Sequence, residues 1–375
     1  MGTVAGIVIL VMSITGVLLA YQRQIIRWAD RQYRHSTASP QSARLAPEAL
    51  LEKVRAVRQA VPTALTRRSD PDEPVAAEFG RDNIVYLNPG TGAVLGEGSH
   101  RVRTFFRRTE DWHRWLAAGI ESRETARGIT GIANLLFLGL LCSGFYLWMP
   151  KQRTLKHIRP AAWFRRGLGG RARDWNWHNT IGVWCVLPLF VIVLSGVVMS
   201  FPWANNLVYR MTRSDAPAQN GRGGRGDAII PADAKLDGLD ALWRRAEQQT
   251  PGWTIITMRM PASPKAPVQF QIDSGDGGRP DLRAQLTLNR KSGEVVRWEP
   301  FASNNAGRRL RSWIRFSHTG EAGGIPGETV AAIASTGGAF LVCTGLSLAI
   351  RRAARAIARR KSAAERAVPL AEVAG

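Results

Sequence analysis

Four long apolar stretches alternate with polar segments along the 375 residues of the chain. None of the four contains an Asp, Glu, Lys or Arg, and each is close to the roughly 20 residues that a helix needs to cross a bilayer. They are Gly2–Tyr21, Ile129–Met149, Thr180–Phe201 and Val330–Ile350. The pattern predicts four membrane-spanning helices, because a helix satisfies its own backbone hydrogen bonds where water is absent.

The first stretch has a second interpretation, a secretory signal peptide, because it is N-terminal and short. No basic region precedes it, however, and Tyr21-Gln22-Arg23 follows it in place of a cleavage site of small residues. We therefore expect it to remain as the first span.

The short connections indicate the orientation, because excess Lys and Arg mark the cytoplasmic side. The loop 151–177 and the tail 352–375 both carry such an excess. We expect a multi-pass protein of the bacterial inner membrane with both termini in the cytoplasm. Two long segments, about 22–128 and 202–329, then lie in the periplasm.

The two outer segments resemble each other. Helical apolar spacing at Leu50–Val61 and at Leu239–Gln249 is followed in each by strand-like runs. A strand, a glycine-containing turn and a second strand recur at Ile84–Leu95 and Ala284–Val296, which is typical of a β-hairpin. Residues 211–228 are interpreted as a flexible linker.

The expected fold class is therefore an α-helical membrane protein, a four-helix bundle of two tandem repeats that carries two small α+β domains. The expected parts are transmembrane helix 1 at 1–22, the first α+β domain at 23–104, a periplasmic helix with transmembrane helix 2 at 105–150, the basic loop at 151–177, transmembrane helix 3 at 178–202, the second α+β domain at 203–305, transmembrane helix 4 with its preceding segment at 306–351 and the basic tail at 352–375.

Charge and cysteine content narrow the function classes. The net charge of +22 fits a basic surface for anionic ligands, or solvated arginines beside anionic lipid. The basic residues are scattered and accompany no nucleic-acid-binding motif, so nucleic acid is not an expected partner. Cys142, Cys185 and Cys343 all lie in predicted spans, where we expect them to pack, and no disulfide is expected in the outer domains.

Each span also holds a Ser/Thr-Gly pair. Glycine lets a helix or a flat cofactor approach the backbone, and the adjacent hydroxyl can bond back to its own helix. The pairs are Thr15-Gly16, Ser143-Gly144, Ser195-Gly196 and Thr344-Gly345.

Three of the six histidines occupy related places in the two repeats. His113 and His318 precede the second and fourth spans at similar distances, at the predicted outer face. His178 begins the third span at the inner face, and its expected counterpart falls just before Met1. His157, in the basic loop, is the only substitute within the chain. For each histidine alone the alternative is a polar anchor at the interface, and His35 and His100 are expected to be surface residues.

Histidines from different helices of a bundle suit haem, because neutral imidazole binds iron axially and nearby glycines accept the flat macrocycle. We expect two haem b sites, with haem iron as the only metal, and the pattern identifies no catalytic side chain. The candidate residues are the axial ligands His113, His318 and His178, the propionate partners Arg114, Arg311 and Arg315, and the haem-packing glycines Gly16, Gly144, Gly196 and Gly345.

Several motifs together resemble one family. They are Ser13-Ile14-Thr15-Gly16, Trp112-His113-Arg114-Trp115, Ser143-Gly144-Phe145-Tyr146-Leu147-Trp148-Met149-Pro150, Trp177-His178-Asn179-Thr180-Ile181-Gly182 and His318-Thr319-Gly320-Glu321 with Gly323-Gly324-Ile325-Pro326-Gly327. Over nearly its whole length the chain resembles the PepSY-associated transmembrane helix family, which includes iron-regulated membrane proteins and ferrisiderophore reductases. The hairpins with Gly92 and Gly293 resemble its PepSY domains.

The resemblance implies a bis-histidine, di-haem inner-membrane reductase that passes electrons to a periplasmic ferric siderophore or other ferric chelate. His113 and His318 match the outer ligand positions of the family and His178 the inner one. The chain departs from the family in having no histidine-containing stretch before its first span. The electron donor is not identified, since no nucleotide-binding motif is present.

Two other functions fit the same sequence. One is a non-catalytic envelope protein whose outer domains bind peptides or regulate a peptidase. The other, a siderophore permease component, is weaker, because the spans hold no charged residue to line a pathway.

Overall fold

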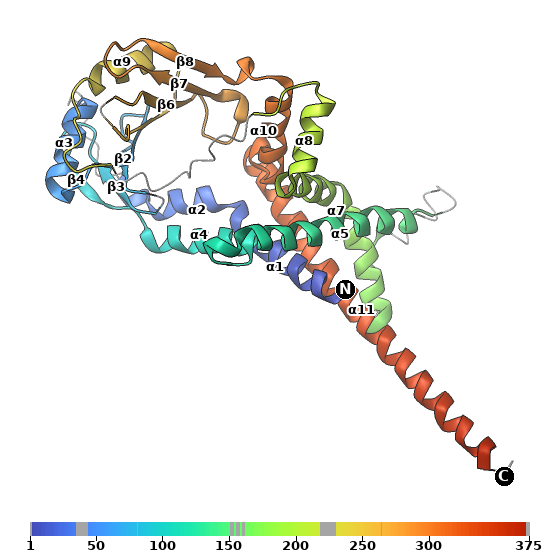
Figure 1. Cartoon of the computed structure of the whole chain (residues 1–375). Helices are drawn as coiled ribbons and strands as arrows, with labels where there is room; N and C mark the ends of the chain where they lie inside the picture. Colours follow the sequence, from blue (N-terminus) through green and yellow to red (C-terminus); the bar gives the residue numbers. More distant parts are fainter. Residues whose placement is uncertain are drawn as a thin grey trace. The chain divides into compact units, whose positions relative to one another are not determined.

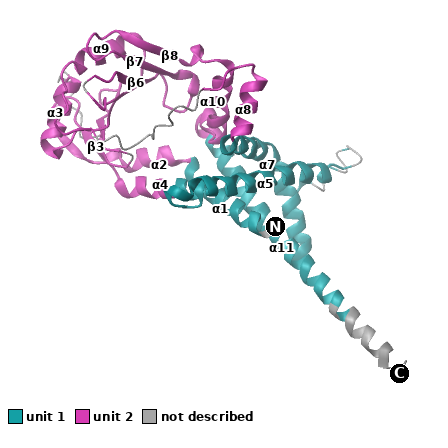
Figure 2. Cartoon of the chain, viewed as in Figure 1, with its two compact units in different colours: residues 1–20, 110–201, 328–375 teal, residues 21–109, 202–327 magenta. Residues whose placement is uncertain are grey.

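The computed structural model describes residues 2–34, 44–80, 82–150, 154, 158–159, 162–217, 230–263 and 265–372. The chain divides into two compact units, each built from separate stretches of sequence (Figure 2). The helical unit comprises Met1–Ala20, Glu110–Phe201 and Glu328–Gly375, and the sheet unit comprises Tyr21–Thr109 and Pro202–Gly327.

The helices and short 3-10 turns are distributed along the whole chain (Figure 1). In order they are α1 (Gly2–Ala20), α2 (Gln22–Ala29), η1 (Arg31–Tyr33), α3 (Pro47–Arg58), α4 (His100–Trp115), η2 (Ile120–Ser122), α5 (Arg123–Trp148), α7 (Gly170–Ser200), α8 (Pro202–Met211), α9 (Leu239–Gln249), η3 (Pro280–Leu282), η4 (Phe301–Ser303), α10 (Ala306–His318), η5 (Glu321–Gly323) and α11 (Gly324–Glu372).

Three helical segments among the described residues are long and apolar enough to cross a membrane, namely His100–Trp148, Gly170–Ser200 and Glu321–Arg360. A fourth is present if the bent pair of α1 and α2 counts as one span. Length and composition thus agree with the predicted helical membrane protein. The helices extend beyond the apolar stretches, since α5 already begins at Arg123 and α7 at Gly170.

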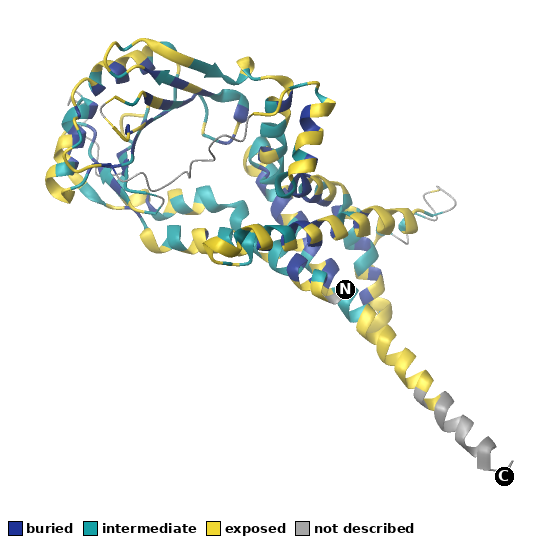
Figure 3. Ribbon diagram, viewed as in Figure 1, coloured by how far each residue is buried: buried dark blue, intermediate teal, exposed yellow. Residues whose placement is uncertain are grey.

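Large apolar side chains remain exposed along these helices (Figure 3). Tyr146 and Leu147 are both 80% exposed, and Leu187 is 77% exposed. Such surface is unfavourable in water and favourable in lipid. All three cysteines are free thiols; Cys185 is buried as expected of a packing residue, whereas Cys142 and Cys343 are exposed.

The sheet unit holds one eight-stranded sheet with the order β4-β3-β2-β1-β5-β6-β7-β8. The strands are β1 (Ala64–Arg68), β2 (Val75–Glu78), β3 (Ile84–Leu87), β4 (Val94–Glu97), β5 (Ile255–Arg259), β6 (Val268–Asp273), β7 (Arg283–Leu288) and β8 (Val295–Pro300).

The two outer segments, expected as separate domains, meet in the middle of this sheet. Strand β1 pairs antiparallel with β5, with Leu65 opposite Met258, and the neighbouring Thr66 and Thr257 hydroxyls are 2.8 Å apart. One core cluster contains residues of both segments. Pairing the two edges satisfies backbone groups that each half would otherwise leave open.

Helices α3 and α9 cover one face of the sheet. Leu50 and Leu51 of α3 and Leu242 and Trp243 of α9 are at most 2% exposed and belong to the shared core. Helix α9 has the predicted bounds, and α3 begins three residues before the predicted Leu50 because Pro47 suits a first helical turn.

The first turns of α3 and α9 hold each other. The Glu48 amide donates to Asp240 Oδ1 at 2.8 Å, and the Asp240 amide donates to Glu48 Oε1 at 2.9 Å. Carboxylates satisfy amides that the first turn of a helix leaves unpaired. The two outer segments are therefore joined twice, by the β1–β5 strand pair and by the exchange of hydrogen bonds between α3 and α9.

Both predicted hairpins are present and have the same turn. Asn88 Oδ1 accepts hydrogen bonds from the amides of Gly90 and Thr91, as Asn289 Oδ1 does from the two residues that follow Arg290. Gly92 and Gly293 close the turns at φ 70° and 69°, a region that favours glycine. Of the predicted linker, 211–217 is described, and 218–228 lies outside the described residues.

Candidate functional site

His113, a predicted haem ligand, contacts the Thr-Gly pair of α1 within the helical unit. Its Nδ1 is 2.9 Å from Thr15 Oγ1. The Thr15 hydroxyl also lies 2.6 Å from the Val11 carbonyl oxygen of its own helix. Because a hydroxyl has one proton, which the Val11 carbonyl accepts, Thr15 Oγ1 must accept the hydrogen bond from His113.

This hydrogen-bond direction fixes the histidine tautomer. With the proton on Nδ1, the lone pair of the neutral His113 ring is on Nε2. A histidine that ligates a metal commonly donates its other ring N–H to such a partner, which orients the ring and raises its basicity. The Thr15 contact is thus the kind that supports a histidine ligand.

His178, near the start of α7, makes the same contact with the Thr-Gly pair of α11. Its Nδ1 is 2.9 Å from Thr344 Oγ1, and that hydroxyl donates to the Phe340 carbonyl oxygen at 2.7 Å. The lone pair of the neutral His178 ring is again on Nε2. Two histidines that are far apart in sequence therefore each contact a threonine hydroxyl through Nδ1, and both have the same tautomer.

The glycine of each Thr-Gly pair lies beside the imidazole ring. A β-carbon placed on Gly16 would lie 3.5 Å from His113 Cε1 and 3.3 Å from Ser335 Oγ. On Gly345 it would lie 3.6 Å from His178 Cε1. The distances to the two rings are those of ordinary van der Waals contact, so each imidazole packs beside its glycine, and the tighter contact at Gly16 is with Ser335.

The two Ser-Gly pairs have other surroundings. At Gly196 a β-carbon would lie 2.6 Å from Asn134 Nδ2, which donates to the Val193 carbonyl oxygen at 2.8 Å, so α5 and α7 pack closely there. At Gly144 it would meet no described atom within 4 Å. The Ser143 hydroxyl bonds back to its own helix, as predicted for these pairs. Of the four predicted haem-packing glycines, the structure brings Gly16 and Gly345 to a histidine.

His318 is the last residue of α10 and belongs to the sheet unit. It begins the motif His318-Thr319-Gly320-Glu321 with Gly323-Gly324-Ile325-Pro326-Gly327, whose glycines form a tight turn. Gly320 and Gly324 have φ 77° and 58°, and a β-carbon on Gly327 would lie 2.3 Å from the Gly320 carbonyl oxygen. The motif therefore encodes the turn that follows His318, while the pairing of His318 with His113 stays a prediction.

The three predicted propionate partners already have protein contacts. Arg114 is paired with Glu110 at 2.7 Å, and its guanidinium lies 4.3 Å from the centre of the Trp115 ring. In the sheet unit, Arg311 Nε donates to Asn205 Oδ1 at 2.9 Å, and Arg315 lies over a neighbouring aromatic ring. These contacts orient the side chains, and their role towards propionates stays a prediction.

The remaining histidines lie elsewhere. His100 is the first residue of α4, where its Nε2 is 3.4 Å from Thr104 Oγ1. His35 and His157 lie outside the described residues. Within the described ranges, no three His, Cys, Asp or Glu side chains meet as a metal-binding group. A bis-histidine haem needs only two such side chains.

Sequence reasoning missed the threonine hydroxyls as partners of the histidines. One signal was available: the first and fourth spans carry Thr-Gly, whereas the second and third carry Ser-Gly. The threonines are the hydroxyls that the structure places beside His113 and His178. Asn134, which fills the space at Gly196, was also missed, since no local pattern distinguishes it.

Comparison with known families gives one match. Residues 1–352 match the family described as PepSY-associated TM region. No curated protein matches the chain.

Proposed function

The chain belongs to the PepSY-associated TM region family of membrane proteins, and from that premise we propose that it is a haem-containing reductase of the bacterial inner membrane. In this proposal both termini are cytoplasmic, and electrons pass from an unidentified donor to a periplasmic ferric siderophore or other ferric chelate. Reduction of Fe(III) to Fe(II) weakens the binding of iron by its chelator, which releases the metal for uptake.

One observation carries the proposal, the repeated contact between a histidine and a Thr-Gly pair. His113 and His178 each hold a proton on Nδ1 towards a threonine at 2.9 Å, and each ring lies against a glycine. If the two histidines were only polar anchors at the membrane interface, nothing would require both to be oriented by the same kind of contact. Haem bound at Nε2 would supply one-electron transfer.

The proposed division of labour follows the two faces of the membrane. His113, with His318 as its proposed partner, holds the outer haem b, and His178 holds the inner one. The arginines Arg114, Arg311 and Arg315 are proposed to bind propionates, because guanidinium groups bind carboxylates by paired hydrogen bonds. The two hairpins, which resemble PepSY domains, belong to the part proposed to receive the chelate.

The visible spectrum of the purified protein tests the proposal. We expect Soret and α bands that shift on reduction, and each of His113→Ala and His178→Ala should lower the haem content. His100→Ala is the matched control, since it removes a histidine at the other end of α4. A colourless protein, or bands that neither ligand variant changes, would refute the haem proposal.

The alternative, a non-catalytic envelope protein that binds peptides or regulates a peptidase, predicts no haem. Strand β8 is an edge of the sheet and exposes Val295 and Val296, and such an edge can accept an extended peptide. Peptide binding that survives His113→Ala and His178→Ala in a colourless protein would favour this function.

A further inference from the structure

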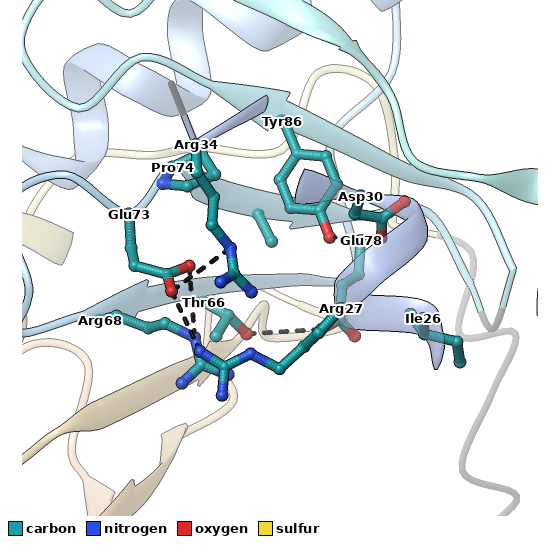
Figure 4. A pocket seen from close by; sticks show the side chains of 11 residues that line it. Ile26, Arg27, Asp30, Arg34, Thr66, Arg68, Glu73, Pro74, Glu78 and Tyr86 are labelled. Atoms are coloured by element: carbon teal, nitrogen blue, oxygen red, sulfur yellow. Dashed lines mark hydrogen bonds and ion pairs between the residues drawn. The ribbon is translucent and has the colours of Figure 1, made fainter. Parts of the chain in front are cut away.

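A pocket lies between α2 with the turn after it and the face of the sheet opposite α3 and α9 (Figure 4). Its cavity volume is about 120 Å³, and it is open to solvent on one side. All its residues belong to the sheet unit. They are Ile26, Arg27, Asp30, Arg34, Thr66, Arg68, Glu73, Pro74, Ala76, Glu78 and Tyr86.

Three arginines from three different places in the fold converge on one carboxylate in this pocket. Arg27 belongs to α2, Arg34 follows η1, and Arg68 ends β1. Their guanidinium groups lie 3.2, 3.5 and 3.9 Å from Glu73, whose side chain is 13% exposed. Figure 4 shows the three groups turned towards this glutamate.

One carboxylate is a poor match for three guanidinium groups. Each guanidinium has about five N–H donors in a fork, and a charge-assisted hydrogen bond is usually about 2.8 Å long. Arg27 donates a hydrogen bond to Glu73 at 3.2 Å. The Arg34 and Arg68 guanidinium groups lie near the same carboxylate at the longer ion-pair distances of 3.5 and 3.9 Å.

The other acids of the pocket do not neutralise this cluster. Asp30 is bound by the Arg103 guanidinium, by the Ser99 amide at 2.8 Å and by the Tyr86 hydroxyl at 2.9 Å. Burial raises the pKa of Asp30, but the hydrogen bonds from Ser99 and the charge of Arg103 lower it by more, so the net pKa lies below its ordinary value. Asp30 is therefore ionised and already paired.

Glu78 forms part of the pocket wall and is largely buried. The Thr66 hydroxyl donates to it at 3.3 Å, and burial raises its pKa, which favours the neutral acid. The Arg68 side chain is 30% exposed, and the Arg68 backbone carbonyl accepts a hydrogen bond from Arg44. The guanidinium groups of three arginines therefore surround the one carboxylate of Glu73.

We propose that this pocket binds a small polycarboxylate anion, and that Glu73 occupies part of the site as an internal substitute for one of its carboxylates. Arginine binds carboxylates in a bidentate fork, and three such groups around one pocket suit a ligand with more than one carboxylate. The binding step does not depend on haem. Only its extension to a carboxylate chelate of ferric iron, as the reducible substrate, rests on the proposed function.

The competing explanation is that Glu73 only fastens α2 to the sheet. The two explanations predict opposite signs for Glu73→Gln. An internal competitor that loses its charge releases the arginines, so an anion should bind more tightly. A glutamate that only fastens α2 leaves affinity unchanged or lowers it when removed.

The test measures citrate binding by calorimetry to the purified full chain at low salt, with ferric citrate as the second probe. We expect citrate to bind the wild-type chain, and Glu73→Gln to strengthen binding by about threefold or more. Arg68→Gln should weaken it by about tenfold, whereas Arg68→Lys, which keeps the charge, should recover part of the loss. Arg279→Gln is the matched control, because Arg279 is exposed and paired with one acid elsewhere in the sheet unit.

Each result decides the matter. Citrate affinity that is unchanged or lower in Glu73→Gln, at an equal melting temperature, would overturn the proposal. So would equal losses in Arg68→Gln and Arg279→Gln, which would indicate attraction to the overall charge, or no binding to either the wild-type chain or Glu73→Gln. Binding of citrate without ferric citrate would keep the pocket and separate it from the substrate. A protein that lacks haem yet binds citrate would contradict only the proposed reductase.

Discussion

Replacing Thr15 by valine tests whether the threonine tunes a metal-bound histidine. Thr15→Val keeps the branched shape and removes the oxygen that His113 Nδ1–H reaches at 2.9 Å. A buried donor that loses its acceptor costs about 1–3 kcal/mol, and loss of such an outer partner lowers metal affinity about 10- to 100-fold. We therefore expect the variant to retain less haem at the His113 site than the wild-type protein.

The reduction potential gives a second and more specific signal. The hydrogen bond from Nδ1 increases electron donation by the ring, which stabilises Fe(III) over Fe(II). Without it the potential should rise, by about 40 mV for each kcal/mol of lost preference in a one-electron couple. Thr344→Val should have the same effect at His178, because its hydroxyl has the same partners.

The assay is a spectroelectrochemical titration of the purified protein, in which the proposed haem would give the signal. Ser143→Ala is the matched control, since the Ser143 hydroxyl bonds to the Gly139 carbonyl oxygen of its own helix at 2.8 Å. Thr15→Ser keeps a hydroxyl and should restore both haem content and potential. If Thr15→Val and Ser143→Ala had equal haem content and equal potentials, the reasoning would be refuted.

Three further variants test the structure itself. Gly196→Ala should destabilise the helical unit by about 1–3 kcal/mol in a detergent unfolding titration, because its β-carbon would lie 2.6 Å from a buried amide nitrogen. Gly144→Ala, whose β-carbon meets no described atom within 4 Å, should cost less. Equal losses of stability in the two variants would contradict the packing. Gly327→Ala places a β-carbon 2.3 Å from a backbone carbonyl and should lower the melting temperature, so an unchanged melting temperature would contradict that turn. Asp30→Asn should flatten the acid side of the stability profile: the pKa of Asp30 is lowered in the folded state, so its contribution is present above about pH 4 and is lost as pH falls through the folded pKa. Circular dichroism across that pH range measures this effect, and an unchanged slope would contradict it.

The sequence predicts the parts of the fold that depend on local chemistry. A run of apolar residues without charge specifies a span wherever it occurs, and the turn at Asn88 and Gly92 specifies its own hairpin. The same holds at Asn289 and Gly293, which is why the comparison of the two segments located both hairpins.

The pairing of the two halves could not be predicted in the same way. Thr66 and Thr257 are neighbours in the sheet although 191 positions separate them in the chain. A strand that alternates apolar and polar residues pairs equally well with many others, so its partner depends on the whole fold. Two similar segments therefore suggested two domains, whereas the structure has one sheet.

The sequence predicted which histidines belong to the candidate site, but it did not predict which side chains contact them. The positions of His113 and His178 before their spans singled them out, but their partners come from other helices. The Thr15 contact spans 98 positions and the Thr344 contact 166. Conversely, Ser195-Gly196 has the same local pattern and packs against an asparagine, because neighbouring helices decide what fills the space beside a glycine.

The pairing of β1 with β5 also determines how a truncated chain that holds only one half of the sheet would behave. The strands run antiparallel about the central pair Thr66 and Thr257, so each offers the other an equivalent edge. This is the geometry of a twofold homodimer, in which a surface meets its own copy. A chain cut after the second span would leave the whole edge of β1 open, and it could close that edge with the missing half or with a second copy of itself. The sheet is thus arranged like the interface of a dimer, with its two halves supplied by separate parts of one chain.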